Sequence, residues 1–578
     1  DGNHAGRRRY TARCIDELVR AGRLRSIMDA SSTGQRGPQP TARIDITTRP
    51  VGSPVDPFVH GHFLESAFFG NIEGGVLDEG SELSVRDGPL QGCRADVLEA
   101  VKDLGVPVLR WPGGNFTSAY WWQDGIGPRD RRPRRLELAW GSEESNRFGT
   151  PEFLAWCAEV GAAPYLAHHC RSVEDAVRWV EYANYAGTTD FAGKRAADGH
   201  PEPWGVRYWG LGNEVYGVWQ MGQRPVAQYV ADARQHARFM RAVDPSLSFI
   251  ACGWQHEDWL EQVVAGLGNQ VDYVSLHLYG LSRHLVDPSS AEFDAVVAQS
   301  VSFEREIIDF SHRISRTAAE HGITRPLGIA LDEWNIRHLE PASWPAPQPG
   351  PNGGVGERTT GGEAASAPYR VNRASQRTLA DALFYAGVFH ALHRSARLAV
   401  PVSMANTVNL INANGLINVR PEGLVRTGSF HVWDLYQNHV GPIPTAHTVS
   451  GPVQTRNVRL GAGHTDASGE PLCTTETVPL LDVLTSLFTG HDRLSLVVIN
   501  RSSRDDITVQ LSLDSSIGRL PTAATTRCIG ADEQDLFAVN TIGTPDRVTL
   551  SKESRVNLDQ GRYTFGAHTV TLLSFHLV

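Results

Sequence analysis

Two short motifs each place a glutamate at the end of an apolar run. The run "VRYWGLGNE" ends in Asn213 and Glu214, and the run "PLGIALDEW" carries Asp332 and Glu333. Two carboxyl groups that face each other are what glycoside hydrolysis requires. One is protonated and assists the departing oxygen, and the other is ionised and attacks the anomeric carbon. The pair predicts such a hydrolase if the fold brings the two motifs together.

The elements that would position these glutamates are eight short apolar runs that alternate with helical patterns. The runs lie at 58–66, 106–114, 164–169, 206–214, 247–254, 271–279, 326–334 and 398–409. Helices are predicted at 93–104, 151–161, 173–186, 226–242, 255–267, 297–321 and 375–394. Eight strand–helix units predict an α/β fold, a (β/α)₈ TIM barrel. A doubly wound open sheet is the alternative, but no G-x-G-x-x-G motif follows a strand.

Catalytic residues of such barrels lie at the carboxyl ends of the strands, so the other polar residues that end the runs are candidates. They are Glu65, Asn115, Asn213, His277, Tyr279 and Asn406. In isolation each has an ordinary explanation: a strand-end glutamate is more often a helix cap, and a lone histidine is more often a hydrogen-bonded core residue. Their coincidence at strand ends of one polarity favours a catalytic site.

The chain outside the barrel divides into three segments. The sequence predicts a flexible extension at 1–41, a strand at 42–57 that joins the second domain, and a C-terminal antiparallel β-sandwich of jelly-roll type at 426–578. One interpretation of the residues before Met28, the first methionine, is an artefact of the gene model. The barrel then covers 58–425, with a long Pro/Gly/Ser-rich loop at 342–372.

Composition excludes several classes of protein. The net charge of −10 offers no basic surface for nucleic acid, and no run approaches the roughly 18 apolar residues of a membrane span. The seven cysteines form no CxxC pair, which argues against a disulfide framework and a zinc site. The N-terminal residues lack the apolar segment of a secretory signal, so we expect a cytoplasmic protein. Secretion is the alternative, because the chain does not begin with Met.

The stretch 108–156, "VLRWPGGNF…EFLAW", closely resembles the α-L-arabinofuranosidases of glycoside hydrolase family 51, and so do "YWGLGNE", "GVWQMG", "SLHLY" and "LDEWN". The resemblance covers about residues 43–578. It implies an exo-acting, retaining barrel enzyme with a C-terminal β-sandwich. Such an enzyme releases terminal α-L-arabinofuranosyl residues from arabinan, arabinoxylan or their oligosaccharides. It needs no metal or other cofactor and is often a homo-oligomer.

The resemblance also implies roles for the candidates. Glu214 would be the general acid/base and Glu333 the nucleophile. Asn213 would bind the sugar 2-hydroxyl, Glu65 and Asn115 other hydroxyls, Tyr279 the nucleophile, and His277 the acid/base region. Because the acid must start protonated, we expect burial and the charge of Glu333 to raise the pKa of Glu214.

Two motifs depart from the family pattern. "MANTVN" places Asn406 where the family usually has glutamine, and "AHHCRS" places His168, His169 and Cys170 where it usually has an asparagine motif. Both departures bear on substrate preference. The alternatives are a retaining β-xylosidase or endo-β-glucanase of the same fold, and a non-catalytic carbohydrate-binding protein. Retention of both glutamates counts against the last.

Overall fold

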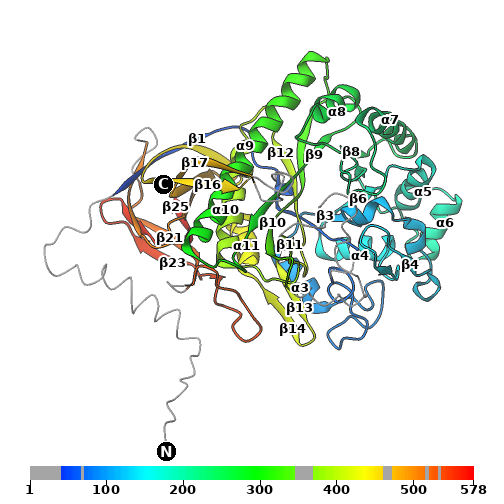
Figure 1. Ribbon diagram of the computed structural model, residues 1–578, viewed down its shortest axis with the longest axis horizontal. Helices are drawn as coiled ribbons and strands as arrows, with labels where there is room; N and C mark the ends of the chain where they lie inside the picture. Colours follow the sequence, from blue (N-terminus) through cyan, green and yellow to red (C-terminus); the bar gives the residue numbers. More distant parts are fainter. Residues whose placement is uncertain are drawn as a thin grey trace, which may run out of the picture.

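The protein consists of a parallel barrel beside a second domain of mostly antiparallel strands (Figure 1). The computed structural model describes residues 41–66, 70–344, 369–459, 472–514, 520–531 and 535–577. The predicted N-terminal extension lies outside these residues, apart from Thr41, and so does most of the predicted loop at 342–372.

Eight parallel strands form a closed barrel, as the sequence predicts. Their order is β2-β3-β6-β7-β8-β9-β10-β12, and β12 pairs back with β2. The strands are β2 (Gly61–Phe63), β3 (Val108–Trp111), β6 (Ala163–His168), β7 (Tyr208–Leu211), β8 (Ser248–Ala251), β9 (Tyr273–Ser282), β10 (Gly328–Pro341) and β12 (Val402–Thr407). Strand β11 (Tyr369–Val371) adds to β10 in the antiparallel sense.

Helices surround the barrel, and two of them are not predicted. The ring contains α3 (Ala95–Leu104), α4 (Thr150–Val160), α5 (Val173–Asn184), α6 (Asp190–Ala197), α7 (Val226–Val243), α8 (Trp259–Leu267), α9 (Ser290–Glu320), α10 (Leu379–Ser395) and α11 (Gly428–His439). The sequence missed α6 and α11. Helix α11 packs between α10 and α3, so the helical ring extends beyond residue 425, where the sequence predicts the end of the barrel. None of the described helices is long and apolar enough to span a membrane.

Side chains from five strands close the interior of the barrel. Val108, Tyr165, Ile250, Ala330 and Met404 form one buried cluster. Because side chains alternate along a strand, the next inward position on each strand lies two residues further on, nearer the carboxyl end. On β3, β10 and β12 these positions carry polar residues. The packed layer therefore forms the floor beneath a polar mouth.

The second domain is one continuous sheet with the strand order β22-β21-β25-β19-β18-β15-β1-β20-β24, and β23 pairs with β21. Its strands are β1 (Ala42–Pro50), β15 (Ile443–Ser450), β18 (Leu481–Leu487), β19 (Arg493–Asn500), β20 (Ile507–Leu513), β21 (Ala523–Gly530), β22 (Thr549–Leu550), β23 (Ser554–Asn557), β24 (Arg562–Phe565) and β25 (Thr569–His576). Strand β1 pairs antiparallel with β15 and parallel with β20. The other strand pairs of this sheet are antiparallel.

Short elements complete the fold. They are the 3₁₀ turns η2 (Pro57–His60), η3 (Asn115–Ser118), η4 (Trp122–Gly125) and η5 (Arg129–Arg131), and the hairpins β4 (Arg135–Leu136) with β5 (Glu143–Glu144), β13 (Ile417–Arg420) with β14 (Gly423–Arg426), and β16 (Val453–Arg459) with β17 (Cys473–Pro479).

A buried ionic cluster joins the two domains. Asp482 of β18 accepts hydrogen bonds from Arg394 of α10 at 2.8 Å and from Arg501 at 2.5 Å, and His390 of α10 lies 3.0 Å from it. Burial alone would raise the pKa of Asp482, but the two guanidinium groups hold it well below its ordinary value. Since a buried charge without its partners is strongly destabilising, this cluster fixes the sheet against α10.

Candidate active site

Arg110 is the central cation of the barrel mouth, and it is not among the residues that the sequence predicts for the site. It lies two residues after Val108 on β3 and is 1% exposed. Its Nη1 donates to Glu333 Oε1 at 2.7 Å, and its Nη2 donates to Asn213 Oδ1 at 2.6 Å. One guanidinium thus holds groups from β10 and from the end of β7. The strict alternation of β3 from Val108 is the signal that could have found it.

A β-bulge turns Glu333 into the mouth. Asp332 is the inward residue that alternation predicts from Ala330, and a register shift between Ala330 and Glu333 interrupts the pairing of β10 with β9. Both carboxylates are consequently buried at the same end of the barrel.

The two oxygens of Glu333 have separate donors. Oε1 accepts from Arg110, and Oε2 accepts from the Tyr279 hydroxyl at 2.7 Å. Gly114 lies against Oε1: a Cβ at this position would lie 2.8 Å from that oxygen. Glycine is therefore required there for the backbone to approach the carboxylate.

Glu214 is presented on a tight turn after β7. Its φ is 43°, in the left-handed region that non-glycine residues seldom adopt, and it follows Gly212 at φ 90°. Its Oε1 lies 2.8 Å from His277 Nδ1, and its Oε2 accepts from Trp219 Nε1 at 2.7 Å. The turn lifts the carboxylate away from the strand and directs it to β9, which carries His277.

His277 lies between carboxylates. Its Nδ1 faces Glu214, and its Nε2 lies 3.3 Å from Asp332 Oδ1. Burial alone would lower the pKa of His277, but the charges and hydrogen bonds of Glu333, Asp332 and Glu214 raise it to about 10. The ring is thus an imidazolium near neutral pH, and both of its nitrogens are donors.

The pKa of Glu214 differs from the expectation. The sequence predicts a raised pKa for Glu214, and burial does act in that direction. The hydrogen bond and charge of His277, together with Trp219 and Arg337, outweigh burial and lower the pKa below its ordinary value. Both pKa shifts favour an ion pair between the His277 imidazolium and the Glu214 carboxylate.

The two glutamates lie close together in this mouth. One oxygen of Glu214 and one of Glu333 are within 4.8 Å of each other and of a His277 nitrogen. A short separation of this kind suits attack by one carboxylate on a carbon whose leaving group contacts the other, whereas an inverting site needs room for a water.

Three other candidates surround the pair. Asn213 is 2% exposed, and its Nδ2 has no hydrogen-bond partner among the described residues. Glu65 is buried, and its Oε1 accepts from the Phe116 amide at 3.2 Å and from Trp140 Nε1 at 3.1 Å. Burial and the charge of Glu333 raise the pKa of Glu65 to about 7. Asn115 begins η3 directly after Gly114 and is half-buried.

Asn406 points inward from β12 but, within the described part of the chain, forms no hydrogen bond to the residues of this cluster. It lies two residues after Met404, at the level of the mouth, and is fully buried. Its Nδ2 donates to the backbone oxygen of His62 at 2.9 Å, which ties β12 to β2. The structure therefore gives this asparagine a barrel-closing contact.

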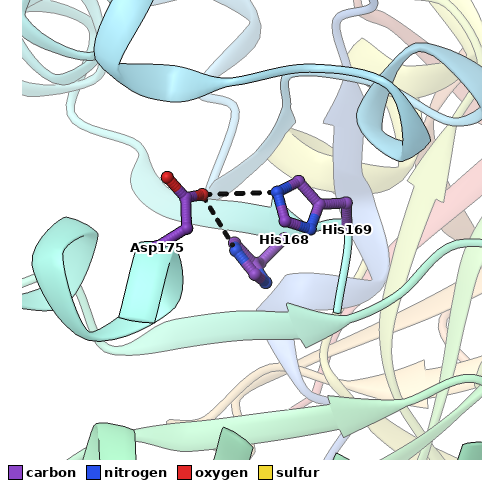
Figure 2. Close-up of side chains that lie close together, drawn as sticks. All are labelled: His168, His169 and Asp175. Atoms are coloured by element: carbon purple, nitrogen blue, oxygen red, sulfur yellow. Dashed lines mark hydrogen bonds and ion pairs between the residues drawn. The ribbon is translucent and has the colours of Figure 1, made fainter. Parts of the chain in front are cut away.

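The second departure, "AHHCRS", forms a hydrogen-bonded cluster at the end of β6. The Nε2 atoms of His168 and His169 approach one oxygen of Asp175 at 3.2 and 3.3 Å (Figure 2). The backbone N–H groups of Cys170 and Arg171 donate to the two Nδ1 atoms, each at 3.0 Å. Each Nδ1 is thus an acceptor, which places the proton of each neutral ring on Nε2. Because Asp175 belongs to α5, these contacts tie the end of β6 to the start of that helix.

Two family models match the chain. One, described as the alpha-L-arabinofuranosidase 1 domain, matches residues 100–296, and one described as the alpha-L-arabinofuranosidase C-terminal domain matches residues 332–569. Together they cover the strands that carry both glutamates and most of the second domain.

Curated proteins and solved structures are similar over almost the whole chain. Alpha-L-arabinofuranosidase C of Emericella nidulans is 32% identical over 90% of this chain and 95% of its own length. An exo-alpha-(1->6)-L-arabinofuranosidase of Bifidobacterium longum is 30% identical over 88% and 91%. The solved structure of the GH51 alpha-L-arabinofuranosidase of Thermotoga petrophila is 31% identical, with a TM-score of 0.78 over 93% of this chain and 100% of that one.

Proposed function

The chain belongs to the α-L-arabinofuranosidases of glycoside hydrolase family 51, and we propose that Glu333 is its nucleophile and Glu214 its general acid/base. The observation that carries this assignment is the close approach of the two carboxylates, within 4.8 Å, with different partners on each. Its substrates are carbohydrates that contain arabinofuranosyl groups. The retaining mechanism of the family proceeds in two steps through a glycosyl-enzyme ester.

In the first step Glu333 attacks the anomeric carbon while the glycosidic oxygen takes up a proton. Arg110 and Tyr279 hold Glu333 in place for this attack, because each donates a hydrogen bond to one of its two oxygens. The negative charge of Glu333 is consumed as the ester forms, and these donors remain beside the developing carbonyl.

The proton comes from the Glu214–His277 pair. It rests on His277 Nδ1, which lies 2.8 Å from Glu214 Oε1. Transfer across this hydrogen bond gives a neutral imidazole and a protonated Glu214, which then protonates the leaving oxygen. In the second step Glu214, ionised again, takes a proton from the water that cleaves the ester and returns it to the pair.

The rest of the pocket selects the sugar. The unpaired Nδ2 of Asn213 is placed to donate to a sugar hydroxyl beside Glu333, and Glu65 is placed to bind another. We propose an exo-acting enzyme that removes terminal α-L-arabinofuranosyl groups from arabinan, arabinoxylan or their oligosaccharides.

A panel of aryl glycosides tests this function. We expect the α-L-arabinofuranoside to be hydrolysed with a kcat/KM at least about 100-fold above that of the matched β-xyloside and β-glucoside, because buried polar groups arranged to bind a furanose would be left unpaired by a pyranose ring. Faster turnover of either pyranoside would assign the chain to one of the alternatives. No turnover of any of them would favour the non-catalytic reading.

The pH profile of His277→Gln tests the proton relay. The pKa of His277 is raised to about 10, so the pair keeps its proton until the pH rises through that value. In the variant Glu214 alone must hold the proton, and a buried carboxyl loses it at lower pH. We therefore expect the basic limb of kcat/KM to move down by about one pH unit or more. Movement to higher pH would show that His277 acts only as a fixed cation that lowers the pKa of Glu214.

A further inference from the structure

A polar cavity opens between the start of α5 and the first three turns of α7. Its volume is about 480 Å³, within the range of small-ligand sites. The side chains that line it include Arg171, Gln223, Arg224, Gln228, Asp232 and Gln235. In a barrel the helices begin at the carboxyl ends of the strands, so this cavity lies at the same end as the two glutamates.

Helix α7 supplies four of the ten residues that line this cavity. Gln228, Asp232 and Gln235 recur at spacings of four and three residues, which places them above one another along the helix. All three are exposed or half-exposed. The buried residues Tyr229 and Ala233 lie between them along the chain and do not line the cavity, whereas the buried His236, which follows Gln235, does. The face therefore presents amide and carboxylate groups, which bind hydroxyl groups in either direction.

The opposite wall is rigidly connected to the catalytic turn. The backbone N–H of Arg224 donates to the oxygen of Val215, the residue after Glu214, at 2.9 Å. The Nη1 of Arg224 donates to the oxygen of Cys170 at 2.9 Å and to Asp232 at 2.7 Å. The cavity and the proposed acid/base thus share one short segment, 214–224.

An exposed aromatic ring, Trp121, contacts Arg171 of the cavity lining. The guanidinium of Arg171 lies over the Trp121 ring, 4.8 Å from its centre, and Trp121 is still 44% exposed. His169 packs edge-on against the same ring at 4.9 Å, and Asp175 holds His169 in place (Figure 2). The unusual "AHHCRS" motif thereby positions a flat apolar surface next to a set of hydrogen-bonding groups.

We propose that this cavity is a secondary sugar-binding site, which binds units of the substrate beyond the glycosidic bond that is cleaved. The inference rests on the proposed function, since Glu214 must face the leaving group and the segment 214–224 leads from Glu214 to the cavity wall. Trp121 provides a surface for the C–H face of a sugar ring, and the α7 amides bind its hydroxyl groups. The ligand class is therefore a neutral oligosaccharide, the backbone from which the arabinofuranosyl group is removed.

Kinetics on substrates of different length test the proposal. The variant is Gln228→Ala with Gln235→Ala, and the substrates are an aryl α-L-arabinofuranoside, which is too short to reach the cavity, and arabino-oligosaccharides and arabinoxylo-oligosaccharides of increasing length. We expect kcat/KM on the longest oligosaccharides to fall about 10-fold through KM, as the loss of two hydrogen bonds predicts, with the aryl substrate within about 2-fold of wild type. Gln262→Ala, an exposed glutamine on α8 outside the cavity lining, is the matched control.

Two outcomes would overturn the site: equal losses on aryl and long substrates, or no loss on either. Trp121→Ala provides a second variant that leaves α7 intact, and the same length-dependent loss is expected from it. The wild-type protein separates this proposal from the assigned function. If it fails to hydrolyse the aryl arabinofuranoside, the function is wrong; if it succeeds and the variants show no length dependence, only the secondary site is wrong.

Discussion

Glu333→Ala is expected to lower kcat on an aryl α-L-arabinofuranoside by a factor on the order of 10⁴ or more, because no other group within reach can form the ester. The neighbours of this carboxylate do not replace it. Arg110 and Tyr279 are donors, and Asp332 is held in place by hydrogen bonds from Tyr165 at 2.7 Å and Ser275 at 2.5 Å. The measurement is single-turnover or steady-state release of the aryl alcohol, with folding checked by thermal denaturation.

Azide provides the control for this variant. The space left by the carboxylate admits a small anion, so added azide should restore aryl release and give an arabinofuranosyl azide of inverted configuration. Glu333→Gln keeps the shape and hydrogen-bonding capacity but not the charge, and should be equally inactive. Near-normal turnover by either variant contradicts the role of Glu333.

The loss of kcat/KM in Glu214→Ala is expected to depend on the leaving group of the substrate. Poor leaving groups, such as sugar alkoxides, should lose about 10²- to 10⁴-fold in kcat/KM, whereas an activated aryl substrate, which needs little protonation, should lose far less. The step that cleaves the ester also slows, because Glu214 activates the water. Aryl release should therefore show an initial burst and then a slow steady state.

Added azide again discriminates between roles. With Glu214 removed, azide can attack the ester in place of water, and the product should retain its configuration, opposite to the Glu333 result. Equal losses on poor and activated leaving groups would contradict the acid/base role of Glu214, and so would the absence of a burst.

Most of the fold could be predicted because the eight barrel strands are short apolar runs that end in polar residues. Helix α11 escaped prediction for a physical reason. Phe430, Val432, Trp433, Leu435 and Tyr436 are all buried, so the helix shows little of the one-sided pattern that sequence reading depends on. Trp433 stacks on Trp334 with ring centres 5.4 Å apart, which places the helix against the strand that carries Glu333.

The candidate site could be predicted in its residues but not in its electrostatics. The alternation of side chains along β3 could have indicated Arg110. Along β10 the same alternation places Asp332 inward and Glu333 outward, and only the bulge in β10 brings both side chains into the mouth. The pKa of Glu214 depends on which groups touch it, and the contact with His277 crosses from β7 to β9. No pattern within either segment encodes that contact.

The most direct test of the central claim is the mass of Glu214→Ala during turnover of an activated aryl α-L-arabinofuranoside. Because formation of the ester stays fast and its hydrolysis becomes slow, we expect the intact protein to become heavier by one anhydropentose unit, and peptide mapping to place that unit on Glu333. A protein of unchanged mass during a burst of aryl release, or a sugar attached to any other residue, would contradict the assignment of Glu333 as the nucleophile of a retaining arabinofuranosidase.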